Sequence, residues 1–296
     1  FRSIGFSIEG LFGGVMSLEF DPHTTRYHPG NALCFARVAK YAYEKLDDGS
    51  PDEDRICSLL KGHDPAFLAV HAFNANSAQG LVIEHERSII AGFRGADEFG
   101  DWLDNINVVS VEFGFGEVHK GFLNALLDIW PAMKSRIREL RPVGRHSQHL
   151  PLWLTGHSLG GAMATLAAAQ LIDEDTAFCG VYTFGQPRVG NREFARIYNR
   201  EAASRSFRFQ NNNDIVSRVP ARAMGYSHVG NFVYISEDQK TLSSDVGFWF
   251  RFLDRVRGAV QDLGDLNFDG VKDHAMAGYL KAIEDWGDRE PQGGFE

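Results

Sequence analysis

The chain has 296 residues, of which 44% are hydrophobic, enough to bury the core of one large α/β domain or two small ones. Its net charge of −9 argues against a nucleic-acid partner and against simple electrostatic docking on anionic lipid. The longest apolar stretch near the middle, residues 162–169, is far shorter than the ~20 residues that span a bilayer. We therefore expect a soluble protein with one domain over residues 1–296.

The three cysteines and the N-terminal sequence leave the compartment open. Cys34, Cys57 and Cys179 lie far apart, cannot all pair internally and do not have the spacing of a metal site, so they predict no disulfide framework. No basic start followed by an apolar segment is visible. The localisation is therefore unknown, with secreted and cytoplasmic both possible.

Helical and strand-like patterns alternate along the chain. The helical patterns cover residues 31–46, 118–140, 162–172 and 191–203, and the strand-like ones cover 67–74, 78–92, 151–155, 180–184 and 206–210. Such alternation predicts an α/β fold with a mainly parallel central sheet and helices on both faces. In such sheets the functional groups gather at the carboxyl ends of the strands.

A short amphipathic segment follows the second strand-like pattern. Its apolar residues recur at helical spacing, and Asp97, Glu98, Asp101 and Asp104 occupy the other face. The apolar members are Phe99, Trp102, Leu103 and Ile106. The pattern alone fits a surface helix docked on the core as well as it fits a substrate-binding element.

Ser158 lies at the junction between a predicted strand and a predicted helix. It is the central residue of G-x-S-x-G, here Gly156-His157-Ser158-Leu159-Gly160. In a nucleophile elbow this turn is so sharp that side chains at the glycine positions would collide with neighbouring backbone. The strand–turn–helix setting favours a nucleophile over a helix-capping serine.

A serine nucleophile requires a histidine base and an acid, in the hydrolase chain order serine, acid, histidine. Asp214 follows the strand-like residues 206–210 in a polar turn and is the candidate acid. His228 and His274 are the candidate bases. We favour His274, because it follows a turn and starts the last predicted helix, whereas His228 precedes a strand-like run that it could simply cap.

Over nearly its whole length the chain resembles the class 3 lipase family, the fungal-lipase-like branch of the α/β hydrolases. The similar motifs are "GFRGADEFGDWLDNI", "VHKGFLNAL", "TGHSLGGAMATLAA", "VYTFGQPRVGN", "NNNDIVSRVP" and "YSHVG". The resemblance implies Ser158 as nucleophile, Asp214 as acid and His274 as base, and it places His228 on a motif that is not catalytic.

The resemblance also implies an oxyanion hole and a lid. The oxyanion donors would be the backbone N–H groups of Ala96 and Leu159, and the lid would cover approximately residues 97–106, with the amphipathic stripe as its substrate-binding face. The family usually has Ser or Thr where this chain has Ala96. Because the donor is the backbone, we expect catalysis to persist.

No metal or cofactor is expected. Residues 265–276 resemble the start of an EF-hand loop, but Met276 stands where a bidentate Glu is needed and Lys272 adds positive charge. His146 and His149 have no acidic or thiol neighbours that would complete a zinc site.

The sequence therefore predicts a serine carboxylic-ester hydrolase that acts on acylglycerols through an acyl-enzyme. Its partner would be a lipid or other ester substrate, and no protein partner is implied. The alternatives are a phospholipase A1 or feruloyl esterase of the same fold and, from another class, a catalytically silent hydrolase fold used for binding. No triad member is missing, which argues against the silent fold.

Overall fold

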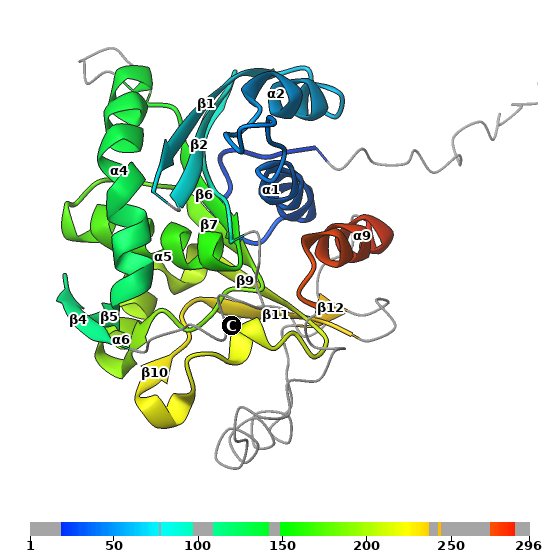
Figure 1. Ribbon diagram of the computed structural model, residues 1–296. Helices are drawn as coiled ribbons and strands as arrows, with labels where there is room; N and C mark the ends of the chain where they lie inside the picture. The colour runs from blue at the N-terminus through cyan, green and yellow to red at the C-terminus, as the bar shows by residue number, and fades with distance from the viewer. Residues whose placement is uncertain are drawn as a thin grey trace, which may run out of the picture.

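The computed structural model describes residues 19–76, 78–96, 109–141, 149–236, 242–243 and 273–287. Within them, eight strands form a central sheet in the order β1-β2-β3-β6-β7-β9-β11-β12 (Figure 1). Their bounds are β1 Phe67–Ala75, β2 Ala78–His85, β3 Ser88–Phe93, β6 Leu152–His157, β7 Gly180–Phe184, β9 Ser206–Asn211, β11 Asn231–Ile235 and β12 Leu242–Ser243. The neighbouring strands β3, β6, β7, β9 and β11 of this sheet are parallel, and β1, β2 and β12 add antiparallel pairs. The sheet is therefore mixed and mostly parallel, as the sequence predicts.

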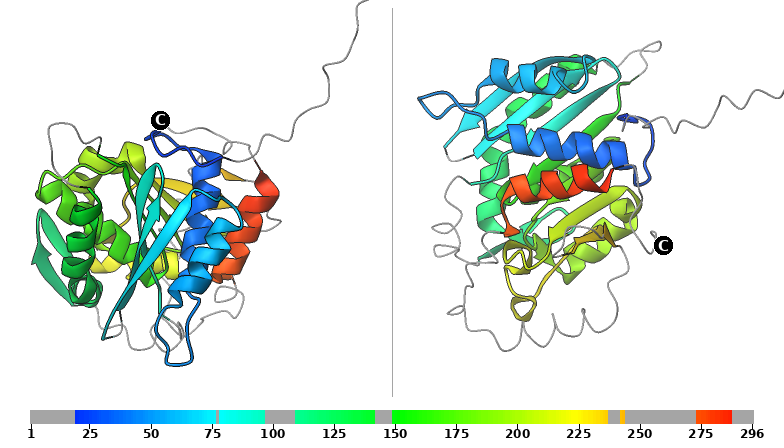
Figure 2. Two further views of the ribbon diagram at one scale, coloured as in Figure 1. Left: turned by 90° about the horizontal axis from the view of Figure 1, so that it is seen from above. Right: turned by 90° about the vertical axis from the view of Figure 1, so that its right-hand side faces the viewer.

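The described helices cover both faces of this sheet (Figure 2). They are α1 Pro29–Tyr41, α2 Glu53–Lys61, α4 Lys120–Leu140, α5 Leu159–Asp173, α6 Arg192–Ala202 and α9 Met276–Trp286. Helices α4 and α5 pack on one face, and α1 and α9 lie side by side on the other. Strands β3, β6, β7 and β9 are buried along their whole lengths. This burial explains the mostly apolar sequences of β3, β6 and β7, whereas β9 alternates apolar and buried polar residues.

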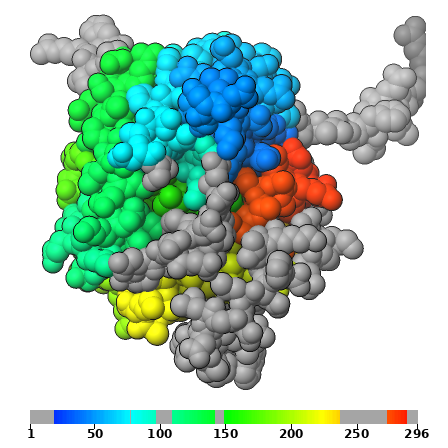
Figure 3. All heavy atoms as spheres, viewed as in Figure 1, coloured from blue at the N-terminus to red at the C-terminus, as the bar shows by residue number. Residues whose placement is uncertain are grey.

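A second, smaller antiparallel sheet was not foreseen. It has the order β10-β8-β5-β4, with β4 Ser110–Phe113, β5 Gly116–His119, β8 Gly190–Asn191 and β10 Tyr226–Ser227. Two of these strands are only two residues long and pair across large sequence separations, so no local pattern marks them. In the space-filling view, α4 (green) lies on the left of the molecule and α9 (orange-red) on the right (Figure 3).

Several element boundaries differ from the sequence-based expectations. The single strand expected over residues 78–92 is the antiparallel hairpin β2–β3, which turns at Glu86 and Arg87. The helix expected over 31–46 ends at Tyr41, because Lys45 pairs with Pro51 in a β-bridge. The helix expected over 118–140 begins at Lys120, because Val118 belongs to β5.

Other segments agree closely with expectation, and one helix was missed. The strand expected over 180–184 is β7, and the helix expected over 191–203 is α6. Helix α2 was not foreseen, although Asp52 caps it by accepting a hydrogen bond from the Arg55 N–H at 2.9 Å. No helix within the described residues is long and apolar enough to cross a membrane.

An aromatic cluster joins α1 to the middle of the central sheet. The Tyr182 ring lies 5.0 Å from Phe35 and 4.8 Å from Phe207 between centroids, and it is fully buried. Its hydroxyl accepts a hydrogen bond from the His28 N–H at 3.1 Å, directly before α1 begins. Tyr182 therefore fixes both the packing and the start of α1.

We expect Tyr182→Ala to lower the free energy of unfolding by about 3–5 kcal/mol, because the variant leaves a large cavity among aromatic rings. Tyr182→Phe should cost about 1–3 kcal/mol, since it leaves the His28 N–H without its acceptor. Urea denaturation measures both values. Leu127→Ala, at a residue 46% exposed on α4, is the control, and a similar loss there would contradict the assignment of Tyr182 to the core.

Candidate active site

The carboxyl ends of four parallel strands meet at one edge of the central sheet. The strand register aligns Phe93 of β3 with Gly156 of β6, His157 with Phe184 of β7, and Phe184 with Phe209 of β9. The loops that follow β3, β6, β7 and β9 therefore leave the sheet together. Ala96, Ser158 and Asp214 all lie on these loops.

Ser158 adopts a strained backbone conformation between β6 and α5. Its φ of 59° and ψ of −128° lie in a region that residues with a side chain rarely adopt. The Ser158 N–H donates to the Phe184 carbonyl at 2.9 Å, which anchors the turn to β7. This is the geometry expected of a nucleophile elbow.

The glycines on either side make this turn possible. A Cβ at Gly156 would lie 2.3 Å from the Gly160 carbonyl oxygen, and a Cβ at Gly160 would lie 2.1 Å from the Phe93 carbonyl oxygen. Both distances are far shorter than any real contact of this kind. The close approach of α5 to β3 therefore requires glycine, as the motif predicts.

Asp214 and His274 form a buried hydrogen-bonded pair. His274 Nδ1 lies 3.1 Å from Oδ1 and 3.0 Å from Oδ2 of Asp214. Asp214 is fully buried and His274 is 4% exposed. The structure thus brings together the acid and the favoured base that lie 60 residues apart in the sequence.

Two further groups hold the Asp214 carboxylate. The Val216 N–H donates to Oδ1 at 2.8 Å, and the Tyr279 hydroxyl donates to Oδ2. Burial, and next the charge of Asp214, raise the pKa of Tyr279 well above its usual value, so this phenol stays protonated and remains a donor. The Asp214 carboxylate is therefore oriented by the loop after β9 and by α9.

Gly185 leaves the space in which the Asp214–His274 pair lies. Its φ is +57°, and an added Cβ would lie 2.7 Å from Asp214 Oδ2 and 2.8 Å from His274 Nδ1. Any side chain at this residue would displace one member of the pair. The residue follows β7 directly, and its N–H donates to the Phe209 carbonyl of β9 at 3.0 Å, which holds this loop close to the sheet.

The candidate oxyanion donors lie beside Ser158. Leu159 is the first residue of α5, so its N–H has no acceptor within the helix and lies at the positive end of the helix dipole. A Cβ built on Gly95, the residue before Ala96, would lie 3.0 Å from Ser158 Cβ. The backbone that carries Ala96 thus passes next to Ser158.

Other predicted residues fall elsewhere or outside the described part of the chain. His228 lies near Arg208, Arg188 and Arg222. Its burial, and next the charges of these arginines, hold the pKa of His228 well below the usual range. Phe99, Trp102, Leu103 and Ile106 lie outside the described residues, as do His146 and most of the segment that resembles an EF-hand loop. Among the described residues, no group of three or more His, Cys, Asp or Glu side chains could hold a metal ion.

Sequence reasoning missed Gly185 and Tyr279 as members of the site. Tyr279 could have been sought as a polar residue on the apolar helix that follows His274, five residues further on. Gly185 carries no local signal beyond its place directly after a strand.

Ser158 is 2% exposed, and its Oγ makes no hydrogen bond to a described residue. In free enzymes catalytic hydrogen bonds are often long and shorten on substrate binding.

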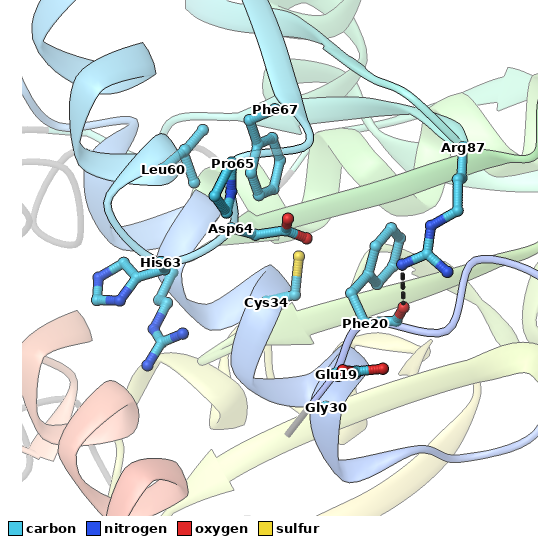
Figure 4. A pocket seen from close by; sticks show the side chains of 11 residues that line it. Glu19, Phe20, Gly30, Cys34, Leu60, His63, Asp64, Pro65, Phe67 and Arg87 are labelled. Carbon is cyan, nitrogen blue, oxygen red and sulfur yellow. Dashed lines mark hydrogen bonds between the residues drawn. The ribbon is translucent and has the colours of Figure 1, made fainter. Parts of the chain in front are cut away.

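A separate cavity lies on the α1 side of the sheet (Figure 4). It has a volume of about 490 Å³ and is lined by residues of α1, α2 and the segments that flank them, among them Cys34, His63 and Asp64. The Arg87 guanidinium closes one side by donating to the Phe20 carbonyl at 3.1 Å. None of Ser158, Asp214 and His274 lines this cavity, so it is distinct from the candidate active site.

Sequence comparisons with known proteins agree with the family resemblance of the motifs. The model of the family "Lipase (class 3)" matches residues 90–224, which include Ser158 and Asp214. The secreted mono- and diacylglycerol lipase A of Penicillium cyclopium is 31% identical over 237 residues, which cover 72% of this chain and 75% of that protein. Phospholipase A1-II 1 of Oryza sativa subsp. indica is 26% identical over 227 residues, which cover 67% of this chain and 56% of that protein.

A structural comparison gives the same fold. The triacylglyceride lipase of Rhizomucor miehei superimposes with a TM-score of 0.60 at 22% identity, covering 70% of this chain and 80% of that chain. The fold is therefore that of an α/β hydrolase. The chain belongs to the class 3 lipase family and is a serine ester hydrolase.

Proposed function

We propose that this single-domain protein hydrolyses acylglycerols through an acyl-enzyme formed on Ser158. The observation that carries the proposal is the buried Asp214–His274 pair at the sheet edge where Ser158 occupies a strained turn. Strained serines at strand–helix turns are typical of nucleophiles, and a carboxylate on Nδ1 orients a histidine base.

In the proposed mechanism His274 accepts the Ser158 proton as Oγ attacks the ester carbonyl. The Asp214 carboxylate stabilises the imidazolium and keeps Nδ1 protonated, so that Nε2 serves as the base. The N–H groups of Ala96 and Leu159 hold the oxyanion, and each such donor contributes about 2.7–4 kcal/mol to transition-state stabilisation. His274 then protonates the leaving alcohol, and water releases the fatty acid.

The substrate class rests on the named relatives. The Penicillium relative is named for mono- and diacylglycerols, which supports acylglycerol esters as substrates. The rice relative is named a phospholipase A1, which keeps a glycerophospholipid as the second candidate; a feruloyl ester stays an alternative from the sequence alone. The same Penicillium relative is named as secreted, which supports secretion of this chain.

We further propose that residues 97–106 form a lid over the active site. The support is the amphipathic pattern of Phe99, Trp102, Leu103 and Ile106, which begins directly after the proposed oxyanion residue Ala96. Exposing this stripe to water costs roughly 25 cal/mol per Å² of apolar area, so opening would be favoured only at a lipid surface.

We expect a fluorophosphonate probe to label Ser158 and Ser158→Ala to lose both labelling and ester hydrolysis. Triad members act as a unit, so kcat should fall by several orders of magnitude, up to about 10⁶-fold. Mass spectrometry of the labelled peptide locates the adduct. An adduct on another residue, or an active Ser158→Ala variant, would disprove the mechanism.

We expect Gly185→Ala to lower kcat by about 100-fold or more, because its Cβ would separate Asp214 from His274 and small displacements of reacting groups are this costly. Gly225→Ala is the matched control, since Gly225 also has a positive φ, +88°, but an added Cβ would meet nothing within 4 Å. Steady-state kinetics on a soluble ester compare the two. Equal losses in both variants would mean that the close contact at Gly185 does not matter.

We expect Trp102→Ser to lower hydrolysis of emulsified long-chain triglyceride much more than hydrolysis of a soluble short-chain ester. Trp102 is the largest apolar side chain of the proposed lid and would supply most of its lipid contact. Assays above and below the solubility limit of the substrate measure the effect. A proportional fall in both activities would assign residues 97–106 to the scaffold. Activity on phosphatidylcholine alone would favour the phospholipase.

A further inference from the structure

Tyr43 and His157 connect two parts of the candidate active site. The Tyr43 hydroxyl lies 2.8 Å from His157 Nδ1, although the residues are 114 positions apart. His157 Nε2 lies 2.7 Å from the backbone oxygen of His274. The Tyr43 hydroxyl also takes a backbone hydrogen bond from Gly95, the residue before the proposed oxyanion donor Ala96. One side-chain pair thus contacts both the oxyanion loop and the backbone of the proposed base.

The chemistry of the partners fixes the direction of each hydrogen bond. A backbone carbonyl can only accept, so His157 Nε2 carries the proton and donates to His274. In the neutral ring Nδ1 is then an acceptor, and the Tyr43 hydroxyl donates to it. This leaves the oxygen of Tyr43 free to accept from the Gly95 N–H. All these bonds are satisfied together only by this one tautomer.

His157 must stay neutral for this arrangement to persist. It is 5% exposed, and burial, followed by the neighbouring His274, lowers its pKa well below the usual range. The His157 ring is stacked on the His274 ring, with centroids 4.4 Å apart and planes 29° apart. A neutral ring at this distance does not repel the imidazolium that His274 becomes during catalysis.

Other contacts hold Tyr43 itself. The Arg94 guanidinium lies over its ring at 5.4 Å from the centroid, and Arg94 joins β3 to Gly95. A Cβ on Gly95 would lie 2.4 Å from the Tyr43 hydroxyl oxygen, so the loop passes directly against the phenol. Tyr43 follows the end of α1, so the helix on one face of the sheet reaches the site through this residue.

We propose that Tyr43 and His157 are positioning residues that set the distance between the proposed oxyanion donor at Ala96 and the proposed base His274, on either side of Ser158. This inference rests on the proposed function. The pair acts through the Gly95 backbone and through His274, whose backbone oxygen and ring His157 contacts, and it is not assigned a contact with the substrate. Its loss should therefore lower kcat while the KM for a small soluble ester stays nearly unchanged.

The test compares three substitutions that break different hydrogen bonds. Tyr43→Phe removes the hydroxyl but keeps the ring under Arg94. His157→Asn can still accept from Tyr43 but is too short to reach the His274 carbonyl. His157→Gln places an amide N–H near the former Nε2 and can still donate to that carbonyl.

The matched control is a second tyrosine–histidine pair near the end of α1. The Tyr41 hydroxyl lies 2.8 Å from His63 Nε2, and the two rings are stacked with centroids 6.0 Å apart. His63 lies just after α2 and lines the separate cavity, whose lining includes none of the proposed catalytic residues. Tyr41→Phe thus removes the same kind of hydrogen bond away from the site.

We expect Tyr43→Phe and His157→Asn each to lower kcat on a short-chain p-nitrophenyl ester by about 10-fold to 100-fold. His157→Gln should recover much of the loss seen in His157→Asn. The double variant Tyr43→Phe/His157→Asn should lose less than the product of the two single losses, because the residues act as one pair. Tyr41→Phe should keep the kcat of the parent protein.

Near-UV circular dichroism and thermal unfolding, recorded with the kinetics, separate positioning from folding. The proposal is overturned if Tyr43→Phe and His157→Asn match Tyr41→Phe in kcat, if only KM changes, or if kcat falls only as the folded fraction falls. Failure of the proposed function has a different signature, namely a Ser158→Ala variant that keeps its activity. If Tyr43→Phe and His157→Asn keep full activity while Ser158→Ala is inactive, this inference is rejected and the proposed function stands.

Discussion

The backbone of Ser158 is held in a conformation that a serine adopts only at an energetic cost. Its φ of 59° and ψ of −128° persist because surrounding contacts enforce them. Gly156 and Gly160 let α5 approach β3 and β6 to distances that no side chain would allow, and the Ser158 N–H is bound to β7. The strain therefore depends on the parallel strands β3, β6 and β7 lying in register, and the sheet's packing against α4, α5 and α1 supports this register.

The rest of the site is arranged around one buried carboxylate. Asp214 has no solvent contact, and a buried charge is tolerated only when it is fully hydrogen-bonded. His274, the Val216 N–H and Tyr279 supply these bonds, while Gly185 leaves room for them. Because Tyr279 lies on α9 and also accepts from the Asn211 N–H of β9, the carboxylate links the last described helix to the sheet. Packing of α9 beside α1 thereby contributes to the orientation of the proposed base.

Sequence reasoning predicted those residues of the candidate site that local patterns mark. Ser158 was found from its glycines and its strand–helix junction, Asp214 from its place after a strand, and His274 from chain order and the family resemblance. Gly185, Tyr279 and Tyr43 were missed, because each acts on a residue that only the fold brings near. The same reason explains why the small β10-β8-β5-β4 sheet was missed, because its β5–β8 and β8–β10 pairings are long-range. The β2–β3 hairpin was missed because its apolar residues continue on both sides of the turn.

A crystal structure of the protein inactivated by an alkyl phosphonate would test the account most directly. We expect the phosphorus to be bonded to Ser158 Oγ, with the phosphoryl oxygen about 2.7–3.1 Å from the N–H nitrogens of Ala96 and Leu159. His274 Nε2 should lie within hydrogen-bond distance of Ser158 Oγ or the remaining ester oxygen, with the Asp214 contact retained. A phosphonate on another residue, or a phosphoryl oxygen directed away from both N–H groups, would contradict the account.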